Sequence, residues 1–220
     1  MTTTQILFIR HGETDWNRVK RIQGHIDIPL AQTGVAQAQQ LAARLADEAR
    51  DGLRLDAIYS SNLQRARQTA EPIAARLDLP VVLNEGVRER NYGAFQGHDS
   101  TQIAEQFPDA YAHWQTRDPG FEPPGGESQR ALYHRVWHAI DAIAAAHAGG
   151  RIAIVTHGGV LDCVYRRAAQ LPLDAPHQYQ LLNTSLNVVE TDGEAVRIVR
   201  WADVDHLDGR SDDDGYRKVM

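Results

Sequence analysis

Short runs of apolar and β-branched residues alternate along this chain with longer segments whose apolar positions recur every three or four residues. The short runs predict buried strands at 6–9, 55–59, 81–83 and 152–155, and a hairpin of strands at 186–190 and 195–199. The longer segments predict helices at 33–48, 63–77, 101–107, 128–148 and 160–169. Because strands and helices alternate, we expect a three-layer α/β/α sandwich with a mostly parallel central sheet.

Two residues in the predicted helices have specific expected roles. The hydroxyl of Thr33 can accept a hydrogen bond from a backbone N–H of the first turn, so Thr33 is the predicted N-cap of the first long helix. Pro72 has no N–H to donate and should kink the second helix or begin a new first turn.

The domain organisation follows from length and from local composition. A chain of 220 residues suits one domain, so we predict a single domain over residues 1–220. Glycine, proline and aromatic residues are mixed over residues 91–126, which we interpret as an insertion that acts as a lid. The acidic tail at about residues 204–220 is predicted to be mobile.

Charge and cysteine content narrow the classes of partner. The formal net charge is −6, and without an extended basic face we expect no nucleic-acid partner. Lysine occurs only at Lys20 and Lys218, so most of the positive charge is arginine, which can hold phosphate through two hydrogen bonds. With Cys163 as its only cysteine, no signal-peptide pattern and no membrane-spanning segment, the chain is predicted to be cytoplasmic.

Two predicted strands, far apart in the sequence, each end in histidine followed by glycine. His11 precedes Gly12, and His157 precedes Gly158 and Gly159. In a parallel sheet the carboxyl ends of the strands lie at the same edge, where ligands bind. The glycines allow the backbone to approach a ligand closely, so we expect the two histidines to face a shared pocket.

The residues around these histidines resemble the signature of the histidine phosphatase superfamily, also called the phosphoglycerate mutase-like family. The resemblance extends from Phe8 to about Asn187. It is carried by the following segments and residues: 8–14 with Trp16 and Asn17, Arg21, Gln23-Gly24, 27–30, Thr33-Gly34, 60–63, Arg65-Ala66, 68–70, Arg88-Glu89, Tyr92-Gly93, Gln96-Gly97, 126–128, 156–158 and 183–185.

This resemblance implies a phosphoglycerate mutase-like fold and a role for each matched residue. His11 would attack phosphorus, Arg10, Arg65 and His157 would bind the phosphoryl oxygens, and Glu89 would donate a proton to the leaving group. By similarity, a further set would contact the phosphate, orient the site or border the substrate: Asn17, Arg21, Gln23, Gly24, Arg90, Tyr92, Thr156 and Gly158.

The chemistry of phosphoryl transfer asks for the same set of groups. The reaction requires positioning and neutralisation of the charge on the phosphoryl oxygens, which arginines can supply without a metal, so we expect no metal and no cofactor. His11 must be neutral to attack, and neighbouring arginines lower its pKa. Glu89 must hold a proton near neutral pH, which requires burial or a negative neighbour such as the substrate phosphate.

Three functions are compatible with this site. We expect a phosphomonoesterase acting on a small phosphorylated metabolite, as in the small bacterial phosphatase branch. The alternative is a cofactor-dependent phosphoglycerate mutase that interconverts 3- and 2-phosphoglycerate and needs a bisphosphorylated primer. Two departures count against the mutase: Asn91 replaces a histidine, and Gln115-Thr116 follows Trp114 where mutases have two arginines. The third candidate is an inactive phosphate-binding protein. A homodimer is left open.

Overall fold

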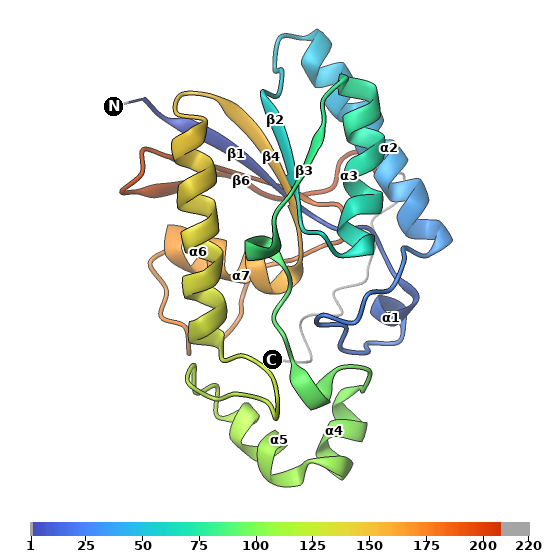
Figure 1. Ribbon diagram of the computed structural model, residues 1–220, viewed down its shortest axis with the longest axis vertical. Helices are drawn as coiled ribbons and strands as arrows, with labels where there is room; N and C mark the ends of the chain where they lie inside the picture. The colour runs from blue at the N-terminus through green and yellow to red at the C-terminus, as the bar shows by residue number, and fades with distance from the viewer. Residues whose placement is uncertain (1, 208–220) are drawn as a thin grey trace.

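A six-stranded sheet forms the centre of the protein, of which this computed structural model describes residues 2–207. The strand order is β3-β2-β4-β1-β5-β6 (Figure 1). The strands are β1 (Thr4–Arg10), β2 (Ala57–Ser60), β3 (Val81–Leu83), β4 (Arg151–Thr156), β5 (Leu186–Thr191) and β6 (Val196–Asp203). Neighbouring strands are parallel from β3 to β1, whereas β5 and β6 are antiparallel. The predictions of a mostly parallel sheet and of a terminal hairpin are therefore confirmed.

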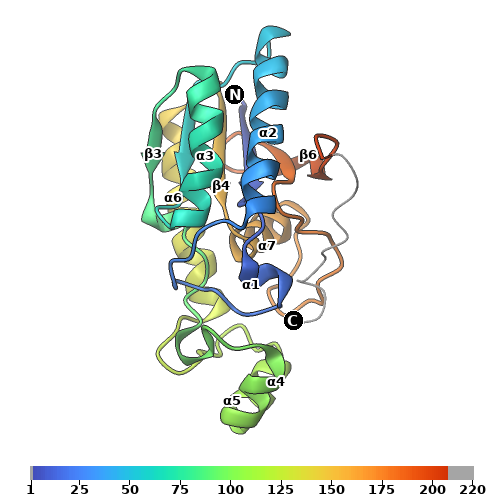
Figure 2. The same cartoon turned by 90° about the vertical axis from the view of Figure 1, so that its right-hand side faces the viewer.

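The described helices connect the strands and cover both faces of the sheet. They are α1 (Asp15–Arg18), α2 (Gln32–Arg50), α3 (Gln64–Leu77), α4 (Ser100–Gln106), α5 (Pro108–Gln115), α6 (Gln129–Ala146) and α7 (Gly158–Ala168), with 3-10 turns η1 (Glu85–Val87) and η2 (Gly93–Phe95). Figures 1 and 2 show α2 and α3 on one side of the sheet and α6 and α7 on the other. The three-layer sandwich is confirmed.

The alternation of side chains along β1 explains the two helical layers. Ile6 and Phe8 are fully buried in a core that includes residues of α6 and α7. Leu7 and Ile9 are fully buried in a second core that includes residues of α2 and α3. Successive strand residues point to opposite faces, and because all four are apolar both faces need a covering layer.

The structure corrects the expected role of Thr33 and one of the two alternatives for Pro72. Ala31, not Thr33, is the N-cap of α2, and the Thr33 hydroxyl instead donates to Glu13 Oε1 at 2.7 Å. Helix α3 continues through Pro72 to Leu77, so Pro72 does not begin a new helix. Burial of Ile73 on the sheet side of α3 supplies tertiary packing that offsets the unfavourable effect of an internal proline.

The segment 91–126 has a small hydrophobic core of its own. Ile22, Tyr92, Phe95, Ile103 and Phe121 form a buried cluster in which the Phe95 ring lies 5.4 Å from that of Trp114. A second helix, α5, was not predicted from the sequence. Figure 1 shows α4 and α5 at one end of the molecule, beyond the sheet. The lid role of the segment stays a prediction.

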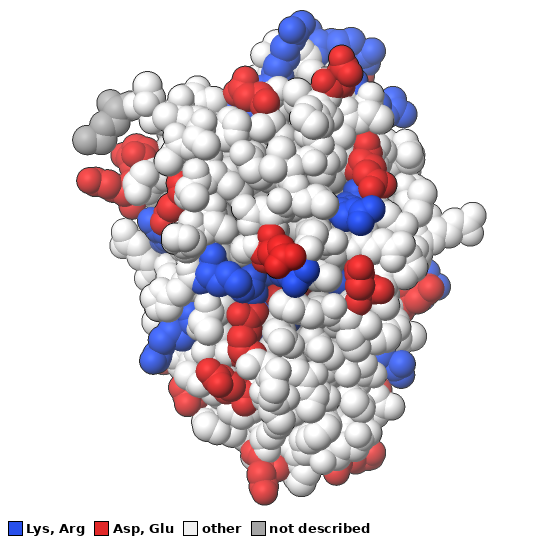
Figure 3. Space-filling view, in the orientation of Figure 1, with Lys and Arg blue, Asp and Glu red and all other residues white. Residues whose placement is uncertain are grey.

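Two other predictions concern the chain end and the surface. The predicted mobile tail at 204–220 falls mainly on residues 208–220, which lie outside the described residues. Among residues 2–207, none of the helices is both long enough and apolar enough to cross a membrane. On the face drawn in Figure 3, Lys and Arg atoms are interspersed with Asp and Glu atoms, so charges of opposite sign are neighbours there.

Candidate active site

The ends of β1 and β4 bring two distant histidines together. These strands are parallel neighbours in which Arg10 pairs with Thr156, so the next residue of each strand, His11 and His157, lies at the same edge. The backbone N–H of His11 donates to Thr156 O at 2.9 Å. The centroids of the two imidazole rings are 5.2 Å apart. The predicted pairing of these histidines is thus observed in the structure.

His11 is buried, and its surroundings define both its charge and its tautomer. Nδ1 lies 2.7 Å from Gly12 O, and because a carbonyl oxygen can only accept, the proton of the neutral ring is on Nδ1. The nitrogen lone pair is then on Nε2. Burial and the charges of Arg65 and Arg10 hold the pKa of His11 well below its usual value of 6.5. His11 is therefore neutral in the free protein.

His157 is fully buried at the start of α7. Its Nε2 lies 2.8 Å from the hydroxyl oxygen of Ser61, the residue that follows β2. Burial, then Arg65, His11 and Arg10, hold the pKa of His157 well below 6.5. Within residues 2–207, its Nδ1 is buried without a hydrogen-bond partner. The site therefore contains two neutral imidazoles.

Two arginines supply positive charge next to these rings. Arg10 is the last residue of β1 and Arg65 is in the first turn of α3, and both side chains are buried. Arg65 donates to Gly24 O at 2.8 Å and to Ile26 O at 3.1 Å, and Arg10 donates to Leu181 O. The positive charges of Arg65 and Arg10 lower the pKa of His11 and also the pKa of His157.

Glu89 lies between η1 and the insertion, and its carboxylate reaches the N-terminus of α7. Oε1 and Oε2 accept from the backbone N–H of Gly159 at 3.1 and 3.2 Å, and Oε1 also accepts from the N–H of Arg90 at 2.8 Å. A Cβ atom at Gly159 would lie 2.3 Å from Oε1, so only glycine leaves room for this contact. The Glu89 side chain is therefore bound to Gly159, the residue two positions after His157.

The loop that contains Arg21, Gln23 and Gly24 borders the arginine side of the site. Gln23 is buried, the Arg21 guanidinium lies 5.6 Å from the centroid of the Trp16 ring, and Gly24 has a positive φ of 52°. A Cβ at Gly24 would overlap Gln96 of the insertion. Since the carbonyl of Gly24 accepts from Arg65, this loop links the insertion to the phosphate-binding arginine predicted from the sequence.

Three predicted site residues, Thr156, Asn17 and Gly158, belong to the local structure around the histidines. Thr156 donates through its hydroxyl to Val87 O at 2.8 Å, which ties the end of β4 to the turn before Glu89. Asn17 accepts through Oδ1 from the N–H of Thr14 at 3.0 Å, in a capping box at the start of α1. Gly158 is the first residue of α7. Thr156 is thus in a position to orient the site.

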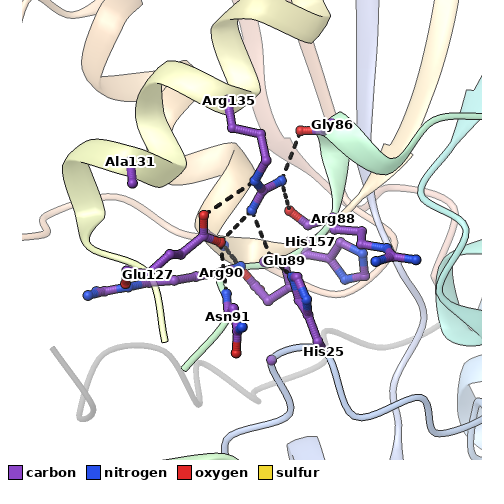
Figure 4. A network of polar contacts seen from close by, with 12 residues as sticks. His25, Gly86, Arg88, Glu89, Arg90, Asn91, Glu127, Ala131, Arg135 and His157 are labelled. Atoms are coloured by element: carbon purple, nitrogen blue, oxygen red, sulfur yellow. Dashed lines mark hydrogen bonds and ion pairs between the residues drawn. The ribbon is translucent and has the colours of Figure 1, made fainter. Parts of the chain in front are cut away.

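Arg90 and Tyr92 lie on the insertion side of Glu89. Arg90 donates to Glu127 O at 2.9 Å and to Phe121 O at 3.1 Å, with its guanidinium 5.1 Å from the Tyr92 ring centroid. In Figure 4 its side chain extends away from His157. Beyond it is a small cavity of about 50 Å³ lined by Arg90, Trp114, Gln115, Arg117, Asp118, Gln129, Arg166, Leu173, Ala175 and His177.

Four residues that were not among the predicted site residues contact the site or its supports. Ser61 bonds His157, Gly159 bonds Glu89, His25 Nε2 lies 2.8 Å from Glu89 O, and Arg135 binds the backbone around Glu89. Ser61 carried a weak signal, because it follows a strand beside β4. The others form contacts over 46 or more positions in sequence, which no local pattern reveals.

Comparisons with known proteins agree with this geometry. The model of the histidine phosphatase superfamily (branch 1) matches residues 6–204. The metal-independent phosphoserine phosphatase of Arabidopsis thaliana is 41% identical over 206 residues, which cover 93% of this chain and 83% of that protein. Phosphoglycerate mutase-like protein 4 of the same species is 40% identical over 207 residues, covering 93% and 87%. The structure of Entamoeba histolytica phosphoserine phosphatase with 3-phosphoglyceric acid has a TM-score of 0.80 at 28% identity, covering 93% and 99%.

Proposed function

The chain belongs to the histidine phosphatase superfamily, branch 1, and is a phosphatase of that family; we propose that it hydrolyses small phosphomonoesters through a phosphohistidine at His11. The observation that carries the proposal is the placement of His11, with Nδ1 against Gly12 O, beside His157 and two buried arginines. A neutral imidazole is nucleophilic at Nε2, and positive charge around it attracts a phosphate dianion.

In the first step, His11 Nε2 attacks phosphorus and the bond from phosphorus to the leaving oxygen breaks. Glu89 gives its proton to that oxygen, while Arg10, Arg65 and His157 stabilise the charge on the remaining phosphoryl oxygens. The buried Nδ1 of His157 would gain a hydrogen-bond partner from the phosphate. In the second step, water attacks phosphorus, the bond to Nε2 breaks and Glu89 takes up the water proton.

For the substrate, we propose a metabolite that carries a second acidic group besides its phosphate. The cavity beside Arg90 supports this choice, because three of its lining residues are arginines, Arg90, Arg117 and Arg166, against one acidic residue, Asp118. The 41%-identical relative is a phosphoserine phosphatase, and phosphoserine carries a carboxylate. A panel of phosphorylated amino acids, sugar acids and neutral sugars would show the highest kcat/KM for the acids, whereas equal values would contradict this choice.

The phosphoenzyme is tested by trapping it. After rapid mixing with p-nitrophenyl phosphate and an alkaline quench, mass spectrometry should locate a phosphoryl group on His11. His11→Ala should lower kcat by at least about 10³-fold without loss of folded structure by circular dichroism, because the nucleophile is removed. The exposed His134→Ala on α6 is the matched control and should retain wild-type activity. An active His11→Ala variant would refute the mechanism.

Phosphatase and mutase activity are distinguished in the same preparations. A mutase would interconvert 3- and 2-phosphoglycerate and would be stimulated by the bisphosphorylated primer, whereas a phosphatase releases inorganic phosphate without it. We expect phosphate release. Asn91, in place of the histidine that the resemblance leads us to expect in mutases, is the residue in this chain that favours hydrolysis.

Metal independence is a separate prediction. We expect full activity after treatment with EDTA, because Arg10 and Arg65 would neutralise the negative charge of the phosphoryl oxygens, which is the role of the metal in metal-dependent phosphatases. The measurement is phosphate release before and after chelation, with added Mg²⁺, Mn²⁺ or Zn²⁺ as the comparison. Loss of activity on chelation and its recovery with one of these metals would overturn the prediction. The cytoplasmic location and a homodimer stay predictions from the sequence.

A further inference from the structure

Arg135, in the second turn of α6, binds the backbone just before and at the proposed proton donor. Its Nη1 donates to Gly86 O at 3.0 Å and to Arg88 O at 3.1 Å, and its Nη2 donates to Glu89 O at 3.1 Å (Figure 4). The three acceptors lie within four consecutive residues. One guanidinium group therefore fixes the path of the chain through Glu89.

Glu127, just before α6, completes this arrangement. It pairs with Arg135 through both oxygens, at 2.5 Å from Nη2 to Oε1 and 3.3 Å from Nε to Oε2. Its Oε1 also accepts from the N–H of Asn91 at 2.8 Å, and its carbonyl accepts from Arg90 Nε at 2.9 Å. Together, Arg135 and Glu127 hold the backbone before and after Glu89.

Only a guanidinium group can form this set of contacts. Arginine has five N–H donors in a rigid planar fork, whereas lysine has three on one flexible nitrogen. The side chains of Arg135 and Glu127 are 26% and 19% exposed, so their interaction is only partly screened by water. Fixing the partly buried Arg135 side chain against three carbonyls and a carboxylate costs conformational entropy. The part of the chain whose conformation it restricts is the backbone through Glu89.

The placement of the Glu89 carboxylate depends on this backbone. Its oxygens reach the N–H of Gly159 on α7, while its carbonyl oxygen is contacted by Arg135 and His25. Proton transfer requires a donor within about 3 Å of its acceptor, and a shift of about 1 Å can cost about 10²-fold in rate. A substitution at Arg135 would therefore slow proton transfer from Glu89, although Arg135 does not contact the reacting atoms.

We propose that Arg135 and Glu127 are positioning residues that hold Glu89 at the distance and angle needed to protonate the leaving oxygen. This proposal rests on the proposed function, because it takes Glu89 as the proton donor. Arg135 acts through the backbone of Glu89 and contacts neither of the catalytic histidines in the hydrogen bonds described for it.

The test uses leaving groups that differ in their need for a proton. An alkyl phosphate such as phosphoserine expels an alkoxide that must be protonated, whereas 2,4-dinitrophenyl phosphate expels a stable phenolate. The rate to measure is that of His11 phosphorylation in single turnovers, because hydrolysis of the phosphohistidine is common to all substrates. Arg135→Met should slow this step by about 10²-fold for phosphoserine and by less than about 3-fold for the dinitrophenyl ester.

Matched variants separate positioning from charge and from folding. Arg130→Met removes an arginine from the same helix at an exposed position and should leave both rates unchanged. Arg135→Lys keeps the charge but not the fork and should behave like Arg135→Met. Glu127→Gln keeps an oxygen for the Asn91 N–H and weakens the ion pair, so it should give a smaller, equally selective loss. Glu127→Gln also tests the positioning role if the Arg135→Met variant does not fold.

Glu89→Gln distinguishes failure of this proposal from failure of the proposed function. If Glu89→Gln slows both substrates equally, Glu89 is not the proton donor and the proposed mechanism fails. If Glu89→Gln is selective for phosphoserine but Arg135→Met and Glu127→Gln slow both substrates equally or neither, the positioning role alone is overturned. In the double variant Glu89→Gln/Arg135→Met, we expect no selective loss beyond that of Glu89→Gln.

Discussion

At the scale of single residues, the reactivity of the site depends on which nitrogen of His11 carries the proton. The contact from Nδ1 to Gly12 O leaves the lone pair on Nε2, and the two arginines disfavour a second proton. The same arginines act on His157. In the proposed mechanism, a phosphate entering the site therefore meets a nucleophile that needs no prior deprotonation.

This state of the histidines predicts their titration. Because both pKa values are held well below 6.5, His11 and His157 should still be neutral at about pH 5.5 in the free protein. ¹⁵N NMR of histidine-labelled protein should report His11 as the Nδ1-protonated tautomer at this pH. Arg10→Gln removes one of the charges and should raise the pKa of His11. A His11 that titrates near its usual pKa in the wild type would contradict the interpretation.

At the scale of secondary-structure elements, the start of α7 serves two side chains at once. His157 is its N-cap residue, and the N–H of Gly159 in the first turn binds the Glu89 carboxylate. The first N–H groups of a helix have no acceptor within the helix, so the N–H of Gly159 is available to the side-chain oxygens of Glu89. The absence of a side chain at Gly159 makes the approach of Glu89 sterically feasible.

Gly159→Ala tests this contact. Its Cβ would lie 2.3 Å from Glu89 Oε1, so the carboxylate must move, and we expect kcat for phosphoserine to fall by about 10²-fold. Alanine is favourable in a helix, so thermal unfolding should change little. The shorter acid in the double variant Gly159→Ala/Glu89→Asp should remove part of the clash and recover some activity relative to Gly159→Ala. Wild-type kcat in Gly159→Ala would show that this contact is dispensable.

At the scale of the whole molecule, the sheet brings the proposed catalytic groups from distant parts of the chain into one buried site. His11 and His157 come from adjacent strands, Glu89 from the turn after β3, and Arg65 from the helix after β2. Burial of two histidines beside two arginines favours function and opposes protonation of the folded state. The stability of the protein should therefore depend on pH.

We predict that the protein loses stability as the pH falls below about 6.5. In the unfolded chain His11 and His157 take up protons near that pH, whereas in the folded state they stay neutral, so the unfolded state binds more protons. Both histidines act in the same direction, so the protein should be less stable at about pH 5.5 than at about pH 7.5. Burial lowers the pKa of His206 to about 4, which acts in the same direction.

Urea denaturation at the two pH values measures this effect. The double variant His11→Asn/His157→Asn removes both titrating groups and should lose less stability than the wild type between them. Inorganic phosphate should stabilise the wild type by binding only the folded state. Equal stability of the wild type at both pH values would contradict the predicted linkage.

The parts of the site that could be predicted are those set by local patterns. Two strand-like runs ending in His-Gly, together with a parallel sheet, were enough to place His11 beside His157, and the family resemblance identified Arg10, Arg65 and Glu89. The N-cap of α2 was predicted wrongly, because Thr33 bonds Glu13 instead of capping its own helix. Helix α5 was not predicted, because its pattern is short and begins directly after α4.

The sequence by itself determined the three layers, the parallel strands and the proposed set of phosphoryl-transfer residues, because periodicity and short motifs depend on neighbouring residues. Only the tertiary structure decided the tautomer of His11, the direction of Arg90 and the support of Glu89 by Gly159 and Arg135. These features depend on hydrogen bonds and close packing, whose angstrom-scale geometry is set by how whole elements pack.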